Sequence, residues 1–132
     1  MFAMKQLLLR PYYQARGLMG LCAATKDQVN ALSHGLEDWG FRAGAAVPGT
    51  CATRGFIISK ANGVNSGIWE CTPGKFDFND RPNCESILIL KGKVKLTDLK
   101  KNEERLLGPG DCAVLEKGSS IRWEILETVR KF

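Results

Sequence analysis

The residues that most often bind metals or act as nucleophiles are scarce in this 132-residue sequence, and their spacing suits neither task. The chain has one histidine, His34, and residues 55–132 contain none. Five cysteines occur without a C-x-x-C pair or histidines at zinc-site spacing: Cys22, Cys51, Cys71, Cys84 and Cys112. Because a cysteine or serine nucleophile needs a nearby base, no catalytic triad is predicted, and the adjacent Ser119 and Ser120 do not change this. Free thiols packed as small apolar side chains, in a reducing compartment, are the simplest interpretation.

A row of lysines is the second feature with chemical potential. Lys91, Lys93 and Lys95 alternate along one apolar stretch, and Lys100 and Lys101 follow in the next turn. The row could contact phosphates, but no aromatic residues are interleaved with it, so nucleic-acid binding is not predicted. A solvated strand edge that resists aggregation is favoured. The net charge of +5 is distributed over both halves of the chain, which indicates a mixed, solvated surface.

The composition is that of one ordinary globular domain. Hydrophobic residues make up 44% and charged residues 25% of the sequence. No apolar run reaches the roughly 18 residues that a membrane-spanning helix needs, so no membrane partner is predicted.

The N-terminal part, residues 1–50, is predicted to be an extension of the main domain. Residues 1–26 contain no acidic residue, which is typical of a transit segment for a plastid or mitochondrion but equally of an ordinary N-terminal helix. Location in the cytoplasm or in an organelle therefore stays open, and no feature points to secretion. Residues 27–39 have Val29, Leu32 and Leu36 at helical spacing and predict a helix. Residues 40–50 are rich in Gly, Ala and Pro and predict a linker.

The sequence pattern changes after residue 50, where short apolar runs alternate with turn residues. Seven short strands are predicted, over residues 55–60, 67–71, 85–90, 93–97, 112–115, 121–126 and 129–132. This pattern predicts an all-β barrel or sandwich. The strand that contains Ile87–Leu90 is apolar on both faces and needs cover outside the barrel. Either the N-terminal extension or a second copy in a homodimer could supply that cover.

Several motifs in this part of the chain are similar to those of a known family. The stretches GIWECTPGKFDF, ESILILKG, GPGDCAVLEKGSSIRWEI and VRKF, in this order, resemble a small single-domain cupin. They are most similar to the subgroup typified by the cupin domain of ureidoglycine aminohydrolase. The resemblance implies a double-stranded β-helix, the RmlC-like jelly roll barrel, over residues 51–132, with a pocket inside the barrel.

The same resemblance indicates that the metal site of the family is missing. Metal-binding cupins carry H-x-H and a glutamate in the first motif and a histidine in the second. Here Glu85 keeps the family's separation from Gly92, residues 80–83 take the place of H-x-H, and Ile121 falls at the position of the second-motif histidine. Only Glu85 remains as a clear candidate for a metal ligand, and Asp80 is a weak candidate. His34 could contribute only if the N-terminal segment folded into the barrel mouth. A catalytic metal needs about three protein ligands, so we predict no metal and no other cofactor.

The motifs place Trp69, Glu85 and Trp123 inside the barrel, with Phe78 on an adjoining loop. These four residues are the predicted ligand-binding set, although core filling is the favoured interpretation of the two tryptophans. Burial would raise the pKa of Glu85 and make it a candidate catalytic acid or base. Glu85 is the one acidic residue expected to point inward, while Arg122 and Arg130 are expected to point outward. A ligand should then offer donors or a positive charge to Glu85 and a flat face to the tryptophans.

Three functional hypotheses follow from these expectations. The leading one is a cupin-domain protein that binds a small molecule in the barrel without a metal. The alternatives are an enzyme that acts on a small amide, ureide or sugar through Glu85, and a structural or interaction module.

Overall fold

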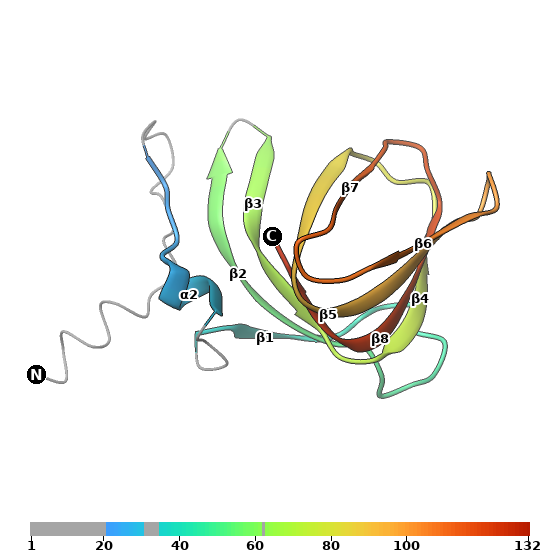
Figure 1. The fold of residues 1–132 in the computed structure, drawn as a ribbon, viewed down its shortest axis with the longest axis horizontal. Helices are drawn as coiled ribbons and strands as arrows, with labels where there is room; N and C mark the ends of the chain where they lie inside the picture. Colours follow the sequence, from blue (N-terminus) through green and yellow to red (C-terminus); the bar gives the residue numbers. More distant parts are fainter. Residues whose placement is uncertain (1–20, 31–34, 62) are drawn as a thin grey trace, which may run out of the picture.

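The computed structural model describes residues 21–30, 35–61 and 63–132, which form antiparallel strands and one short helix (Figure 1). The helix is α2 (Lys26–Asn30), and the strands are β1 (Glu37–Phe41), β2 (Ala52–Ala61), β3 (Val64–Cys71), β4 (Gly74–Phe78), β5 (Glu85–Asp98), β6 (Glu103–Leu107), β7 (Cys112–Leu115) and β8 (Ile121–Lys131). The predicted all-β cupin jelly roll is therefore confirmed. No helix in the described ranges is long and apolar enough to cross a membrane.

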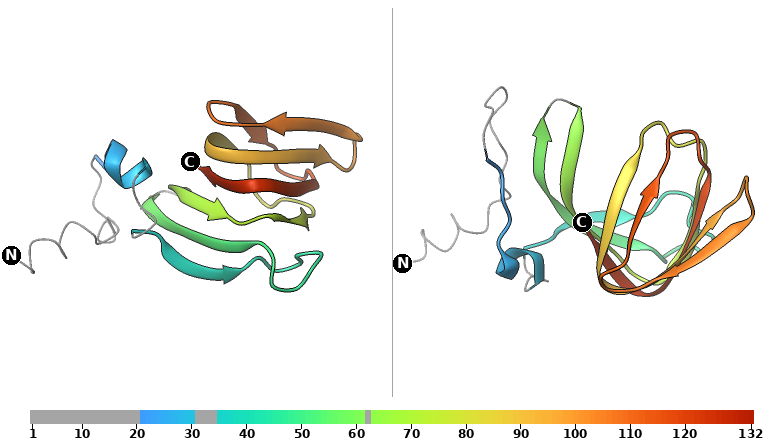
Figure 2. Two further views of the ribbon diagram at one scale, coloured as in Figure 1. Left: turned by 60° about the horizontal axis from the view of Figure 1, so that its bottom comes forward. Right: turned by 45° about the horizontal axis from the view of Figure 1, so that its top comes forward.

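The strands β5 and β8 form the centre of the sheet. The strand order is β1-β2-β3-β8-β5-β6, with β4 also paired to β8 and β7 to β5. Figure 2 shows this order as a stack of curved strands that runs from β1 through β8 and β5 to β6. The strand β8 pairs with three other strands, β3, β4 and β5. Its side chains alternate between the barrel interior and the outer face.

Glycine 92 lies inside one long strand and does not separate two strands as the sequence suggested. The predicted strands 85–90 and 93–97 form the single strand β5, and 121–126 and 129–132 form the single strand β8. Gly92 has φ +84°, and a Cβ atom built on it would lie 2.0 Å from the carbonyl oxygen of Thr128. The register between β5 and β8 shifts on both sides of Gly92, so this residue marks a β-bulge where the two backbones approach closely.

The predicted helix over residues 27–39 is wrong in its second part. The helix α2 ends at Asn30, and Glu37–Phe41 forms strand β1, which pairs with β2. Three apolar residues at helical spacing are a weak signal, and pairing with the edge of a formed sheet outweighs it. Leu32 and His34 lie outside the described residues, as does most of the predicted transit segment.

The predicted linker over residues 40–50 is packed against the barrel. Ala45 forms a bridge with Phe76 of β4, and the amide of Arg42 donates a 2.8 Å hydrogen bond to the carbonyl of Cys51. The Gly and Pro residues in this stretch therefore shape an ordered connection. This connection brings Arg42 to the barrel wall.

Two apolar clusters hold the structure together. The larger one fills the barrel and includes Ile89, Val94 and Val129, each at most 1% exposed. The smaller one lies between β2, β3 and the N-terminal part, where Ile68 contacts partly buried residues such as Val29 and Leu90. The outer face of the two-sided apolar strand is thus covered in part by residues that precede the barrel.

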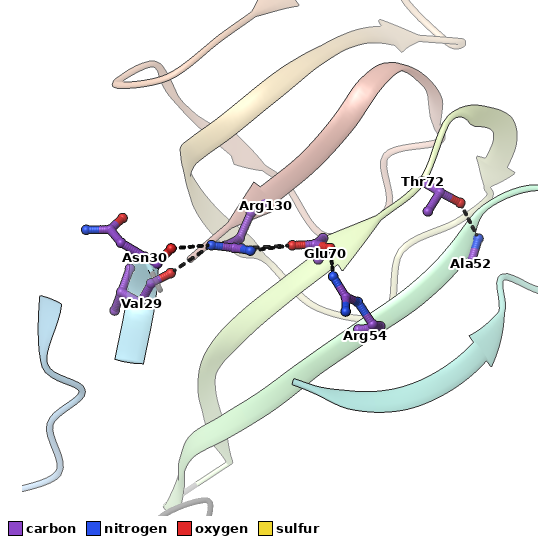
Figure 3. Close-up of polar contacts among 7 residues, drawn as sticks. All are labelled: Val29, Asn30, Ala52, Arg54, Glu70, Thr72 and Arg130. Atoms are coloured by element: carbon purple, nitrogen blue, oxygen red, sulfur yellow. Dashed lines mark hydrogen bonds and ion pairs between the residues drawn. The ribbon is translucent and has the colours of Figure 1, made fainter. Parts of the chain in front are cut away.

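A buried ionic network ties α2 to the barrel (Figure 3). Arg130 of β8 is 6% exposed and donates through Nε to Glu70 of β3 at 2.9 Å. Its Nη1 donates to the carbonyl oxygens of Val29 and Asn30, each at 3.2 Å. Arg54 of β2 contacts the other carboxylate oxygen of Glu70. Arg130 was expected to point outward into solvent, but α2 covers it and its side chain is buried. Glu70 is also directed into the fold, so Glu85 is not the only acidic residue there.

Candidate functional site

The four residues of the predicted ligand-binding set line one cavity. Trp69 of β3, Phe78 of β4, Glu85 of β5 and Trp123 of β8 surround a space of about 190 Å³. We call this space, with all its lining residues, the barrel cavity: Arg42, Trp69, Phe76, Phe78, Arg81, Glu85, Trp123 and Lys131. The juxtaposition follows from strand register, since Phe76 pairs with Trp123 and Trp69 pairs with Lys131.

Aromatic rings form one wall of the barrel cavity. The rings of Phe76 and Trp123 are stacked with centroids 5.8 Å apart and planes 10° from parallel. Trp69 meets Trp123 edge to face at 5.6 Å. Trp123 is 2% exposed and Phe76 is 3% exposed, so both also belong to the core. The tryptophans therefore combine core filling with a position on the cavity wall.

Three cations line the barrel cavity, and the sequence analysis anticipated none of them. The guanidinium carbon of Arg42 lies 4.9 Å from the ring centroid of Phe76, and that of Arg81 lies 4.6 Å from the centroid of Phe78. The ammonium of Lys131 lies 5.1 Å from the centroid of Trp69. Each cation thus rests on an aromatic face, which fixes its position.

One of these cations had a signal in the sequence. Arg81 lies in the segment that takes the place of the H-x-H motif, so a cation at the former ligand position could have been recognised there. Arg42 is in the stretch interpreted as a linker, and the position of Lys131 depends on the register of β8. Neither could be inferred from local patterns.

The carboxylate of Glu85 is bound on both oxygens. Arg81 donates to Oε2 and Lys131 donates to Oε1. Burial alone would raise the pKa of Glu85, but the charges and hydrogen bonds of Lys131 and Arg81 outweigh burial and hold the pKa below its ordinary value. The expectation of a raised pKa for this residue is therefore wrong. Glu85 is an ionised, cation-bound carboxylate at neutral pH.

Several donors in the cavity wall have no partner among the described residues. Nε of Arg42, Nε of Arg81 and Nε1 of Trp123 are buried and make no hydrogen bond there. The Arg81 side chain is 8% exposed, so water has little access to it. All three groups are donors. A buried donor without an acceptor is costly, which makes three in one place informative.

The residues at the family's metal positions do not fit a metal ion. Glu85 is occupied by two cations, and Ile121 is part of the barrel core. Asp80 is 79% exposed and forms an ion pair with Lys100 at 2.8 Å. In the ranges that the structure describes, no three His, Cys, Asp or Glu side chains are grouped for a metal. His34 lies outside those ranges.

Among the described residues, the buried thiols and Lys95 of the lysine row do not form a second site. Cys84 and Cys112 are exposed, so the expectation that they pack as small apolar side chains is wrong. Cys51 and Cys71 are fully buried, and burial together with the neighbouring Cys51 raises the pKa of Cys71 to about 12. Such a thiol is protonated and unreactive at neutral pH. Lys95 of the lysine row forms an ion pair with Glu124 at 3.0 Å on the outer surface of the sheet.

The sequence and the fold were compared with known proteins. Residues 58–132 match the family described as EutQ-like cupin domain. The fold resembles that of a protein of unknown function from Vibrio parahaemolyticus, with 14% identity, a TM-score of 0.55 and coverage of 73% of this chain and 93% of that one. It also resembles the EutQ protein of Clostridium difficile, with 14% identity, a TM-score of 0.53 and coverage of 61% and 64%.

A DUF861 family protein from Thermotoga maritima is more similar in sequence, with 36% identity over 48% of this chain and 70% of that one, at a TM-score of 0.45. No curated protein matches the sequence.

Proposed function

The chain belongs to the EutQ-like cupin domain family, and from this premise we propose that its barrel cavity binds a small molecule without the help of a metal ion. One observation carries the proposal. Four charged side chains converge on an aromatic-walled space of about 190 Å³ beside the apolar cluster that fills the barrel. Small-molecule sites typically combine an apolar wall with a few convergent polar groups.

The enzymatic alternative, with Glu85 as acid or base, receives less support from the geometry. A general acid must carry a proton near neutral pH, whereas the pKa of Glu85 is lowered by Lys131 and Arg81. The same lowered pKa makes Glu85 a weak general base, because the two bound cations stabilise its ionised form. A purely structural or interaction module would not need charged side chains that converge on a cavity, so this alternative also receives less support.

Three further assignments are proposals of the same kind. We place the chain near the ureidoglycine aminohydrolase-type cupins on the motifs quoted above. We assign it to a reducing, intracellular compartment because its described cysteines are free thiols. We also propose a homodimer, since Leu88 on the two-sided apolar strand remains 38% exposed.

A ligand screen tests the small-molecule proposal. Native mass spectrometry of the purified chain against a library of neutral, anionic and cationic metabolites should reveal a bound small molecule. Phe78→Trp enlarges a side chain that lines the cavity and should weaken that binding about tenfold or more. Leu106→Trp, on an exposed position of β6, is the matched control and should leave binding unchanged. Equal binding by both variants would place the ligand elsewhere and overturn the proposal.

Elemental analysis tests the metal-independent part. The purified chain should contain no stoichiometric manganese, iron or zinc, because the ligand positions hold other side chains. About one metal ion per chain, lost in Glu85→Gln, would contradict this expectation.

A further inference from the structure

The charges around the barrel cavity do not balance. Among the described lining residues, Arg42, Arg81 and Lys131 supply three positive charges and Glu85 supplies one negative charge. Three minus one leaves a net charge of +2. Charges in a partly enclosed, aromatic-walled space are screened less by water than charges on an open surface. The cavity should therefore favour an anion.

The hydrogen-bonding groups of the residues that line the cavity also favour an anion, because those without partners are donors. Nε of Arg42, Nε of Arg81 and Nε1 of Trp123 are donors without partners, and no acceptor is left unpaired among the buried side chains that the structure describes. These three donors are buried beneath the cavity surface, so an anion reaches them only when the lining side chains shift. Lys131 donates one bond to Glu85, and an ammonium group can donate two more. Apart from the cation-bound carboxylate of Glu85, the polar side chains of the wall are donors, which are complementary to carboxylate or phosphate oxygens.

The aromatic faces are used by the protein's own cations. Arg42 lies over Phe76 and Phe78, at 4.9 and 5.1 Å from the ring centroids, and Lys131 lies over Trp69 and Trp123, at 5.1 and 5.7 Å. A flat or cationic ligand would have to displace these contacts. The earlier expectation of a ligand that offers positive charge to Glu85 is thus disfavoured by geometry.

The size of the cavity favours a small anion. The space measures about 190 Å³ and is open to solvent on one side. A molecule of about six or seven non-hydrogen atoms fits such a space. Malonate, which has two carboxylates on one carbon, has this size and a charge of −2 at neutral pH.

From the charge, the unpaired donors and the size, we propose that the barrel cavity binds a small, doubly negative oxyanion. This inference rests on the small-molecule site proposed above and names the class of its ligand. The shared chemistry is a compact group of anionic oxygens with a total charge near −2. A short dicarboxylate and inorganic phosphate are its two sources.

Isothermal titration calorimetry with three probes tests the class of ligand. Malonate, inorganic phosphate and malonamide are titrated into the purified full chain, and malonamide is the neutral molecule with the shape of malonate. We expect at least one of the two anions to bind about tenfold or more tightly than malonamide. Malonate binding assigns a dicarboxylate, and phosphate binding without malonate binding assigns a phosphate group.

Two substitutions with opposite expected signs locate the anion in the cavity. Arg42→Met removes a cation and should weaken anion binding about tenfold or more, whereas Glu85→Gln removes the opposing charge and should tighten it severalfold. Arg105→Met is the matched control, because Arg105 is 71% exposed on β6 and distant from the cavity wall. If Arg42→Met does not fold, Glu85→Gln still tests the sign, because weaker anion binding in this variant would contradict the inference.

The outcomes separate this inference from the proposed function. If malonamide or another neutral molecule binds as tightly as malonate, the small-molecule site stands and the anion inference is overturned. Equal anion affinity in Arg42→Met and Arg105→Met, or weaker binding in Glu85→Gln, also overturns it. If none of the three probes binds, the anion inference fails, and the ligand screen decides the site independently.

Discussion

The ammonium of Lys131, at the end of β8, donates a hydrogen bond to the carboxylate of Glu85, the first residue of β5. Arg81 binds the other oxygen of the same carboxylate. This arrangement links the end of β8 to the start of β5 and neutralises one of the three cavity cations. Glu85 therefore sets both local stability and the charge available to a ligand.

Removing the charge of Glu85 should destabilise the protein. Glu85→Gln leaves the buried guanidinium of Arg81 without its anionic partner, so we expect the free energy of unfolding to fall by about 1–3 kcal/mol. Urea unfolding followed by tryptophan fluorescence measures this change. Glu104→Gln, at an exposed position of β6, should change stability by less than about 0.5 kcal/mol. Equal effects of the two substitutions would mean that the Glu85 contacts contribute little.

Breaking the buried network at Glu70 should cost more. Glu70→Gln leaves Arg130 buried at 6% exposure without a charge partner, and breaking a buried pair typically costs about 3–5 kcal/mol. The control is Asp77→Asn, which breaks the exposed pair with Arg122 and should cost about 1 kcal/mol or less. Both variants are compared by urea unfolding at neutral pH. A loss in Glu70→Gln as small as in Asp77→Asn would contradict the structural role of this network.

Stability should fall on the acid side. The pKa values of Glu70 and Glu85 are both below the ordinary value of about 4.3, since the neighbouring cations outweigh burial. The unfolded chain binds protons at these groups first, so their contribution is complete above that value and is lost as pH falls through the folded-state pKa values. The free energy of unfolding should therefore decrease below about pH 5. The double variant Glu70→Gln, Glu85→Gln should show a flatter profile in urea titrations at each pH, and an equally steep profile would assign acid sensitivity to other groups.

The close approach at Gly92 should tolerate no side chain. Gly92→Ala would place Cβ 2.0 Å from the carbonyl oxygen of Thr128 at a positive φ, so backbone strain and a steric clash add up. Gly110 has φ +89° with nothing within 4 Å, so Gly110→Ala meets only the strain of about 1–2 kcal/mol. We expect a clearly larger loss of thermal stability for Gly92→Ala, measured by calorimetry. Equal losses would show that β5 and β8 can separate at the bulge without penalty.

The homodimer is tested by sedimentation. Wild-type protein at micromolar concentration should sediment as a dimer, and Leu88→Glu should shift it toward monomer because it puts a charge on the exposed part of the apolar strand. Leu126→Glu, at a 51% exposed position of β8, is the control. A wild-type monomer, or equal behaviour of both variants, would contradict the proposed interface.

Alternation along the strands predicted part of the barrel interior, but the core residue Phe76 lies in β4, where no strand was predicted. Val94 and Leu96, and likewise Trp123 and Ile125, are buried as period two requires. The motif order added the position of Glu85 on the cavity wall. These features are local, or are fixed by residues close in sequence.

The charges of the cavity and of the network beside it depend on contacts that are distant in sequence. Arg130 is covered by α2, about 100 residues earlier, and its carbonyl partners cannot be read from its own strand. Arg42 reaches the cavity wall only because residues that looked like a linker pack against β4. The pKa of Glu85 is lowered, although its burial alone predicted a raised pKa, for the same reason. Lys131 is distant in sequence and is brought to Glu85 by the register of β8.

The three cavity cations come from segments that lie far apart along the chain: Arg42 before β2, Arg81 between β4 and β5, and Lys131 at the end of β8. An anion held by all three acts as a removable cross-link, because only the closed barrel presents them together. At a concentration of 100 times its Kd, such a ligand would add about 2.7 kcal/mol to the stability of the closed state. Detachment of β8 would therefore release the ligand, and a bound ligand would oppose that detachment.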